Sequence, residues 1–393
     1  MIDILVNKDR RRNVAEKQTD RQAGNQGFTQ IHTQIAKGTA ILLMVYHHLF
    51  VLPERLGYNY TSVINLCGFD VQSILANFAK ICVGIFLFCS GVGLYYSLIN
   101  LKSLKEMYKK VVIHALKFMT NFWIILIFVL AIGLYLNYFE LNGSTVFQMV
   151  TASRNLIEEW WFVRLYLLLL FAAPPIIRLY QDVDVVKKVI PLTIIFAILI
   201  INYFTLNFFG SQDGIIVKII GLFSDLYDFD SVMVFIVGTM CARFNVIESF
   251  QKVTGYKRWI LCTFSVFVAA FIRVMFSNNP LSMQVDFVAV PLFVLPITAL
   301  FYNTKIGTVL QFFAKHSTNI WLTHTFWCYY FGQKIVLFPK YSVLIYIWLL
   351  ILSLVSSYII NLIYVPICNL LFNKLHKFSY KGYFFRKPKD KKD

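Results

Sequence analysis

Charged residues are scarce in this sequence of 393 residues: only 15% are Asp, Glu, Lys or Arg, whereas 58% are hydrophobic. Because soluble domains carry about 25% charged residues, the composition argues against a soluble domain and favours a chain surrounded by lipid. Runs of about 18 or more apolar residues recur, and such runs are long enough to span a bilayer as helices. The net charge of +17 does not indicate a nucleic-acid surface, because the basic residues lie in short segments between the apolar runs.

Paired cysteines and a signal peptide are also missing. The seven cysteines are odd in number, lie mostly within apolar runs and show no metal-ligand spacing such as CxxC. We therefore interpret them as small hydrophobic residues and expect neither a disulfide framework nor a metal site. Residues 1–36 are polar and basic and lack the apolar centre of a cleavable signal peptide. The first membrane helix is then expected to act as the insertion signal.

The apolar runs predict an all-α, polytopic membrane protein with about ten transmembrane helices. They are too long and too evenly apolar to be strands of a membrane barrel. One stretch before the sixth run, GIIVKIIGLF (214–223), could form a separate short or re-entrant piece. The predicted spans are 36–52, 80–99, 111–136, 159–180, 188–208, 229–243, 259–276, 285–302, 317–334 and 341–372.

The positions of the 37 Lys and Arg residues predict the orientation. If the N-terminus is cytoplasmic, most of them fall on the cytoplasmic side, as the positive-inside rule requires, and both termini are cytoplasmic. Residues 1–35 then form a flexible basic arm, 36–373 the transmembrane domain, and 374–393 a basic tail that lies against anionic lipid headgroups. The loops on the other side hold only Arg55, Lys80, Arg154, Lys218, Lys334 and Lys340. Such a chain fits a bacterial inner or plasma membrane.

The stretch IAKGTAILLMVYHHLF (35–50) contains three ionisable residues in an apolar run, where such residues are costly and usually functional. Lys37 lies at the cytoplasmic edge, from which its side chain can reach the interface. His48 follows eleven residues later, and eleven helical steps of about 100° return to within roughly 20° of the same direction while rising about 16 Å. Lys37 and His48 therefore share one helix face, whereas His47 points about 100° away. The small Gly38 allows a second helix to approach closely.

This arrangement resembles the acyltransferase family 3 membrane proteins, which O-acetylate surface polysaccharides and related glycans. The first helix of that family carries a basic residue, ten intervening positions and a histidine, which correspond here to Lys37 and His48. The family more often has arginine at the basic position. Without this resemblance, both histidines could simply lie near the outer interface, where histidine is tolerated.

Three further motifs follow in the family's order. The stretch GIFLFCSGVGLYYS (84–97), which contains Ser90, resembles the phenylalanine-rich second helix ending in Ser-Gly, with Gly84 where many members have an acidic residue. WWFVRLYLLLLFAAP (160–174) resembles the Trp-Phe-rich helix, and AKHSTNIWLTH (314–324) resembles a late segment that ends in histidine. The resemblance covers most of the chain.

The resemblance implies an O-acyltransferase that moves an acyl group, expected to be acetyl, from cytoplasmic acetyl-CoA to a hydroxyl of an extracytoplasmic glycan or lipid-linked sugar. Such a transfer needs a base at the hydroxyl, stabilisation of the tetrahedral intermediate and a pocket for the donor. Since imidazole can take a proton and later return it, His48 is the candidate base. A site partway through the bilayer fits a donor and an acceptor on opposite sides, whereas a site in a cytoplasmic loop does not.

Other ionisable residues in the apolar runs are further candidates, because such groups usually face a bundle interior or a cavity. His324, in the ninth run, is the second catalytic candidate, either as an orienting partner or as a donor contact. Arg164 could contact the oxyanion or the acceptor, or could form a structural ion pair with Glu158 or Glu159.

Substrate contacts are predicted at the two ends of the bundle. At the outer face, Trp160 and Trp161, beside Glu158 and Glu159, could contact the sugar, whereas interfacial belts account for most other aromatic residues. At the cytoplasmic side, the candidate contacts of acetyl-CoA are Lys37, Lys109, Lys110, Lys117 and Ser90.

Alternatives to these contacts are structural. Lys109 and Lys110 correspond to the family's basic cluster before the third helix, but Lys117 could instead extend its side chain to the interface. Arg273 and Asp286, at the outer ends of neighbouring runs, are expected to pair with each other.

Other function classes also fit ten helices with buried charges. A polytopic exporter of a polysaccharide or lipid-linked saccharide often has two similar halves or paired interrupted helices, but the sequence shows no internal repeat, and Pro174 and Pro175 have no counterpart elsewhere. A non-catalytic anchoring protein would leave His48, His324 and Arg164 without a role. A membrane acyltransferase with a lipid or protein acceptor is a further alternative.

Overall fold

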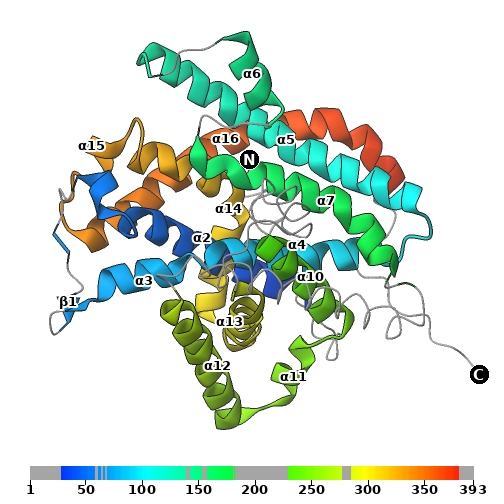
Figure 1. Cartoon of the computed structure of the whole chain (residues 1–393). Helices are drawn as coiled ribbons and strands as arrows, with labels where there is room; N and C mark the ends of the chain where they lie inside the picture. Colours follow the sequence, from blue (N-terminus) through cyan, green and yellow to red (C-terminus); the bar gives the residue numbers. More distant parts are fainter. Residues whose placement is uncertain are drawn as a thin grey trace, which may run out of the picture.

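The computed structural model describes residues 28–57, 61–62, 65–66, 69–138, 142–152, 157–179, 181, 229–276 and 285–379. These residues form an almost entirely helical structure (Figure 1), as the apolar runs predict. The strands β1 (Asn65–Leu66) and β2 (Phe69–Asp70) form one short antiparallel pair. Two 3-10 helices, η1 and η2, span Pro53–Leu56 and Glu158–Trp160. The α-helices are α2 (Gln30–Phe50), α3 (Val71–Ala79), α4 (Cys82–Leu98), α5 (Leu104–Tyr135), α6 (Gly143–Val150), α7 (Trp161–Leu179), α10 (Phe229–Arg243), α11 (Ile247–Lys252), α12 (Gly255–Met275), α13 (Asp286–Phe301), α14 (Lys305–Cys328), α15 (Gln333–Val336) and α16 (Ser342–Ser379).

Side-chain caps fix the starts of three helices that carry candidate residues. Thr29 caps α2 in a capping box with His32, Ser103 caps α5 by accepting from the Glu106 N–H, and Thr304 caps α14 by accepting from the Gly307 N–H. Such caps satisfy backbone N–H groups that have no partner within the helix. Each cap therefore sets where its helix begins, and with it the position of every side chain along that helix.

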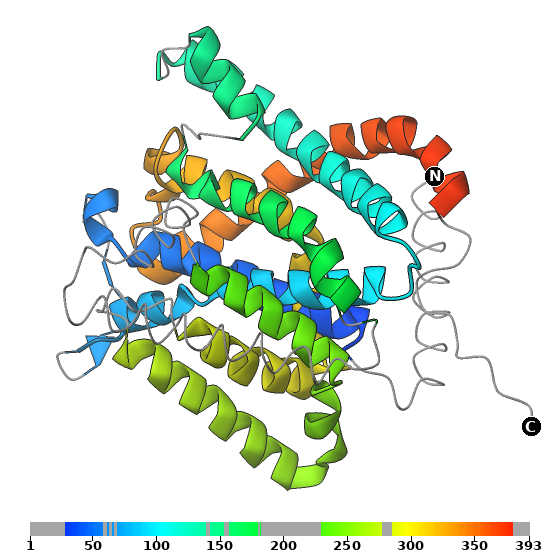
Figure 2. The same ribbon diagram turned by 45° about the vertical axis from the view of Figure 1, so that its right-hand side comes forward.

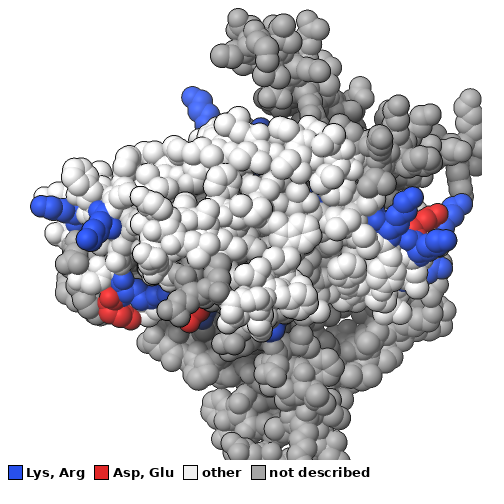
Figure 3. Space-filling model, turned by 90° about the horizontal axis from the view of Figure 1, so that it is seen from above, with Lys and Arg blue, Asp and Glu red and all other residues white. Residues whose placement is uncertain are grey.

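Five helical segments in the described part of the chain are long and apolar enough to cross a membrane, which supports a multi-pass membrane protein. They are 71–98, 104–135, 158–179, 255–275 and 342–372. The pair α13 and α14 counts as a sixth if its two helices, bent by 120°, form one span. Figure 3 shows a broad surface of uncharged residues with Lys and Arg gathered at its ends, as expected for a bundle with a lipid-facing belt.

The predicted count of ten spans with cytoplasmic termini stays a prediction. The run 188–208 lies outside the described residues. The helix of the first predicted span, α2, has 21 residues and is about 31 Å long, yet it is not among the strongly apolar helices, because glutamine, lysine and histidine side chains lower its hydropathy. The ninth predicted span starts at residue 317, whereas the helix α14 already begins at Lys305, because a polar first half, which includes Lys315 and His316, is also helical.

The helix α2 lies in the middle of the bundle and packs against α3, α4, α13, α14 and α16 (Figure 1). Its closest approach is to α14 at Gly38, where a Cβ atom would lie 1.9 Å from the backbone oxygen of Leu310. This confirms the prediction that Gly38 admits a second helix. In Figure 2, most of the long helices run roughly in one common direction, so residues of several helices meet at the same depth.

Candidate active site

A cavity of about 390 Å³ lies among α2, α4, α5, α7, α14 and α16. Lys37 and His48 both line it, whereas His47 does not. The shared face predicted for Lys37 and His48 is thus confirmed, and the cavity follows α2 over the eleven residues between them, a rise of about 16 Å. The Nδ1 atom of His47 instead lies 2.8 Å from the carbonyl oxygen of Ala76 on α3.

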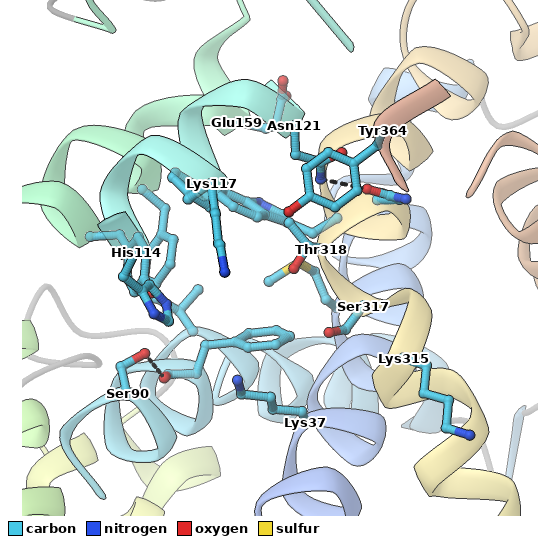
Figure 4. A pocket seen from close by; sticks show the side chains of 18 of the residues that line it. Lys37, Ser90, His114, Lys117, Asn121, Glu159, Lys315, Ser317, Thr318 and Tyr364 are labelled. Carbon is cyan, nitrogen blue, oxygen red and sulfur yellow. Dashed lines mark hydrogen bonds between the residues drawn. The ribbon is translucent and has the colours of Figure 1, made fainter. Parts of the chain in front are cut away.

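Basic side chains surround the end of the cavity that contains Lys37. Lys117, His114 and Lys315 line it there, together with Ser90 (Figure 4). Lys117 points into the space from α5, and the His114 ring is 3.1 Å from the hydroxyl of Tyr166. The ammonium groups of Lys37 and Lys117 at this end create a positive potential that favours an anionic ligand.

His324 lies fully buried on α14, with 5.0 Å between its ring centroid and that of His48. Its Nδ1 is 2.8 Å from the carbonyl oxygen of Trp321 and 3.0 Å from that of Ile320. Since carbonyl oxygens only accept hydrogen bonds, Nδ1 carries the proton, and Nε2 is the acceptor of the neutral ring. No described residue hydrogen-bonds to Nε2. The structure thus brings together the two predicted histidines and leaves a buried lone pair beside His48.

A charged cluster lies at the other end of the cavity, near His48. The carboxylate of Glu159, which lines the cavity, is 3.0 Å from the Arg55 guanidinium and accepts a 3.0 Å hydrogen bond from the Tyr330 hydroxyl. The Arg55 guanidinium also stacks 3.9 Å above the ring of Tyr329, whose hydroxyl donates to the backbone carbonyl of His48. Burial is the largest single influence and would lower the Arg55 pKa, but Glu159, Tyr329 and Tyr330 together raise it, so the guanidinium stays protonated.

Sequence reasoning missed a chain of asparagine side chains in the cavity wall. The Asn121 amide nitrogen donates to the Asn319 side-chain oxygen at 2.7 Å, and the Asn319 amide nitrogen donates to the Asn361 side-chain oxygen at 3.0 Å. All three residues line the cavity, from α5, α14 and α16. The available signal was an asparagine within each of three apolar runs, since such residues hydrogen-bond between membrane helices.

Other predicted residues lie outside the cavity. Trp160 is 1% exposed and donates its indole N–H to the Leu322 carbonyl, so it is a core residue and not an outer sugar contact. Arg164 and Glu158 are exposed, and Glu159 pairs with Arg55, not Arg164.

Of the three α5 lysines predicted to contact acetyl-CoA, only Lys117 lines the cavity. Lys109 is exposed, Lys110 donates to the Ser97 carbonyl, and neither lines the cavity. Of the two tryptophans at the start of α7, Trp161 does line it.

Arg273 and Asp286 pair as predicted, with 3.3 Å between the guanidinium nitrogen Nε and Oδ1, and both side chains are buried. This pair also bears on Gly84. A Cβ atom at Gly84 would lie 3.5 Å from Oδ2 of Asp286 and 2.6 Å from Cγ2 of Val290. An α13 carboxylate therefore occupies the space beside the position where many family members have an acidic residue.

The comparison with known families agrees with this arrangement. A family model described as an acyltransferase domain matches residues 34–362, which include every cavity residue except Tyr364. No curated protein and no solved structure gives a significant match. A match over most of the chain shows the family: this chain belongs to acyltransferase family 3 and is a membrane acyltransferase.

Proposed function

We propose that this acyltransferase moves an acyl group, expected to be acetyl, from cytoplasmic acyl-CoA to a hydroxyl of an extracytoplasmic glycan or lipid-linked sugar. The observation that carries the proposal is the single cavity with Lys37 at one end and His48 at the other. One continuous space lets a donor and an acceptor that enter from opposite sides meet within the membrane.

The donor would enter at the basic end. Its phosphates are anions, and Lys37, Lys117 and Lys315 line that end, where charge-assisted hydrogen bonds to phosphate are favourable. The thioester would then lie deeper, since the rise of about 16 Å from Lys37 to His48 accommodates an extended arm between phosphate and sulfur. Lys109 and Lys110 have no part in this arrangement, because they lie outside the cavity.

His48 would act as the general base. Its ring takes the proton of the acceptor hydroxyl, whose oxygen attacks the thioester carbonyl carbon; the C–S bond then breaks, coenzyme A leaves as a thiolate, and His48 returns the proton to the sulfur. His324 would orient the His48 ring, because its Nε2 lone pair is buried beside that ring. The rigid Nδ1 contacts of His324 to two backbone carbonyls hold that orientation.

The acceptor would approach past Glu159 and Trp161. Both line the cavity, and Glu159 is held in place by Arg55 and Tyr330. A fixed carboxylate accepts hydrogen bonds from sugar hydroxyls, and an aromatic side chain offers an apolar surface to the sugar ring. The pair of residues would thus orient one hydroxyl toward His48.

The test uses inside-out membrane vesicles that contain the native chain, His48→Ala or His47→Ala. With acetyl-labelled acetyl-CoA added outside, we expect label in lumenal glycan or lipid-linked sugar for the native chain and His47→Ala, and none for His48→Ala. The His47 variant is a matched control, because it removes the neighbouring imidazole outside the cavity. Absence of transfer with well-folded native protein and a range of acceptors would refute the proposal and favour an exporter.

A further inference from the structure

The asparagine chain in the cavity wall has a fixed direction. The Asn319 amide group faces the backbone carbonyl of Ser357 at 3.4 Å and the Ser357 hydroxyl at 3.2 Å. A backbone carbonyl only accepts, so the Asn319 atom that faces it is the nitrogen, and the oxygen of Asn319 faces Asn121. The atom of Asn121 bonded to Asn319 is therefore its nitrogen, and its oxygen Oδ1 is the free end.

This free oxygen is an unusual group in the protein interior. Asn121 is only 6% exposed, and among the described residues nothing donates a hydrogen bond to its Oδ1. A buried acceptor without a donor carries a desolvation cost that a donor from a ligand can remove. Asn121 is part of the cavity wall (Figure 4), so a ligand that fills the cavity lies against this side chain.

The position of Asn121 along the cavity matches that of the amide nearest the sulfur of the acyl donor. Asn319 precedes His324 by five residues on α14, which is about 7.5 Å along the axis, and Asn121 is hydrogen-bonded to Asn319. In an acyl-CoA, the amide nitrogen nearest the sulfur lies about 5 Å from the thioester carbon by ordinary bond lengths. That carbon has to come within about 3 Å of the acceptor hydroxyl at His48. The amide N–H then lies at the depth of Asn121.

Resting on the proposed function, we infer that Asn121 Oδ1 accepts the N–H of the amide nearest the sulfur of the acyl donor. Asn319 acts through Asn121 as a positioning residue, because its side-chain oxygen holds the Asn121 amide group in place. The contact sets how far the donor enters and places its thioester at His48. It also selects an amide-containing thioester over a simple alkyl thioester.

The test compares acetyl-CoA with an analogue in which a methylene replaces that single N–H, using the full-length protein in vesicles. We expect kcat/KM for acetyl-CoA to exceed that for the analogue by about tenfold to a hundredfold, the usual effect of an unpaired buried acceptor. Asn121→Leu should lose this preference. Thr120→Val is the matched control, because Thr120 neighbours Asn121 but, among the described residues, its hydroxyl bonds only to the Leu116 carbonyl; this variant should keep the preference.

Three outcomes overturn the inference. Equal kcat/KM for the two donors with the native protein refutes the amide contact while leaving the proposed function intact. This comparison uses only the native protein, so it tests the contact even if Asn121→Leu does not fold. A folded Asn121→Leu variant that keeps the native preference also refutes it. Absence of transfer from acetyl-CoA by the native protein refutes the proposed function and the inference with it.

Discussion

The contact between α2 and α14 at Gly38 gives a prediction that can be worked from one distance. A Cβ atom at Gly38 would lie 1.9 Å from the Leu310 oxygen, whereas Cβ atoms essentially never come closer than 3.0 Å to another atom. The substitution Gly38→Ala therefore requires the two helix backbones to separate by at least about 1 Å. Overpacking of this kind costs about 1–3 kcal/mol, which exceeds the roughly 1 kcal/mol that alanine gains over glycine in a helix.

The separation should also affect activity, because α2 carries Lys37 and His48 while α14 carries His324 and Asn319. A displacement of about 1 Å at a reacting group can lower the rate about a hundredfold. Since Gly38 lies nearer the N-terminal end of α2 than His48 does, the displacement at His48 is smaller, and we expect kcat/KM to fall by about tenfold or more.

The assay is acetyl transfer in vesicles together with thermal unfolding in detergent. Gly93→Ala is the matched control, because no neighbouring atom of the described residues lies within 4 Å of a Cβ at Gly93 on α4. This variant should be at least as stable as the native chain, by up to about 1 kcal/mol, and as active. If Gly38→Ala unfolds at the same temperature and transfers at the same rate as Gly93→Ala, the close approach of α2 and α14 is wrong.

Three further predictions concern single residues. His48→Ala should lower transfer by about 10²–10⁴-fold, measured with labelled acetyl-CoA, whereas His47→Ala should cost far less; equal losses would contradict the helix-face argument. Lys37→Ala should raise the KM for acetyl-CoA with little change in kcat, because it removes one phosphate contact, and an unchanged KM would confine that lysine to anchoring. Asp286→Leu should destabilise the protein by about 3–5 kcal/mol in thermal unfolding, because it leaves the Arg273 charge buried without its carboxylate. Adding Arg273→Leu to this variant should restore most of the lost stability. If the double variant is no more stable than Asp286→Leu, the unpaired Arg273 charge is not the cause of the loss.

Local periodicity was enough to predict one face of the site. The spacing of Lys37 and His48 determines their common direction in any α-helix, so the cavity contains both and excludes His47. The pairing of Arg273 with Asp286 was also predictable, because Arg273 lies in the last turn of α12 and Asp286 in the first turn of the next long helix, α13. These predictions needed only the helical repeat and the order of the spans.

Contacts between distant segments could not be predicted in this way. Arg55 reaches Glu159 from the short helix after α2, although Arg164, the possible partner considered from the sequence, lies much nearer to Glu159 along the chain. Trp160 is buried against α14, whose Leu322 carbonyl accepts the indole N–H. Which face of α5 or α16 turns toward α14 depends on packing, so the asparagine chain is visible only once the helices are assembled.

The bend between α13 and α14 was missed for a local reason. Asn303 adopts a left-handed conformation with φ 58°, in the short connection between the two helices. Asparagine tolerates this conformation better than most residues do, but hydropathy does not report it. The polar start of α14 therefore resembled a loop in the sequence, although it is a helix that turns by 120° from α13.

The depth of the cavity has a consequence for the membrane as a barrier to protons. A cavity that follows α2 for about 16 Å is about half as long as a hydrocarbon core about 30 Å thick. The ammonium groups of Lys37 and Lys117 lie at this space, and positive groups in a pore repel protons and other cations. The side chains proposed to attract the phosphates of the donor thus also oppose proton leakage, and a reaction site can lie within the bilayer without discharging the gradient across it.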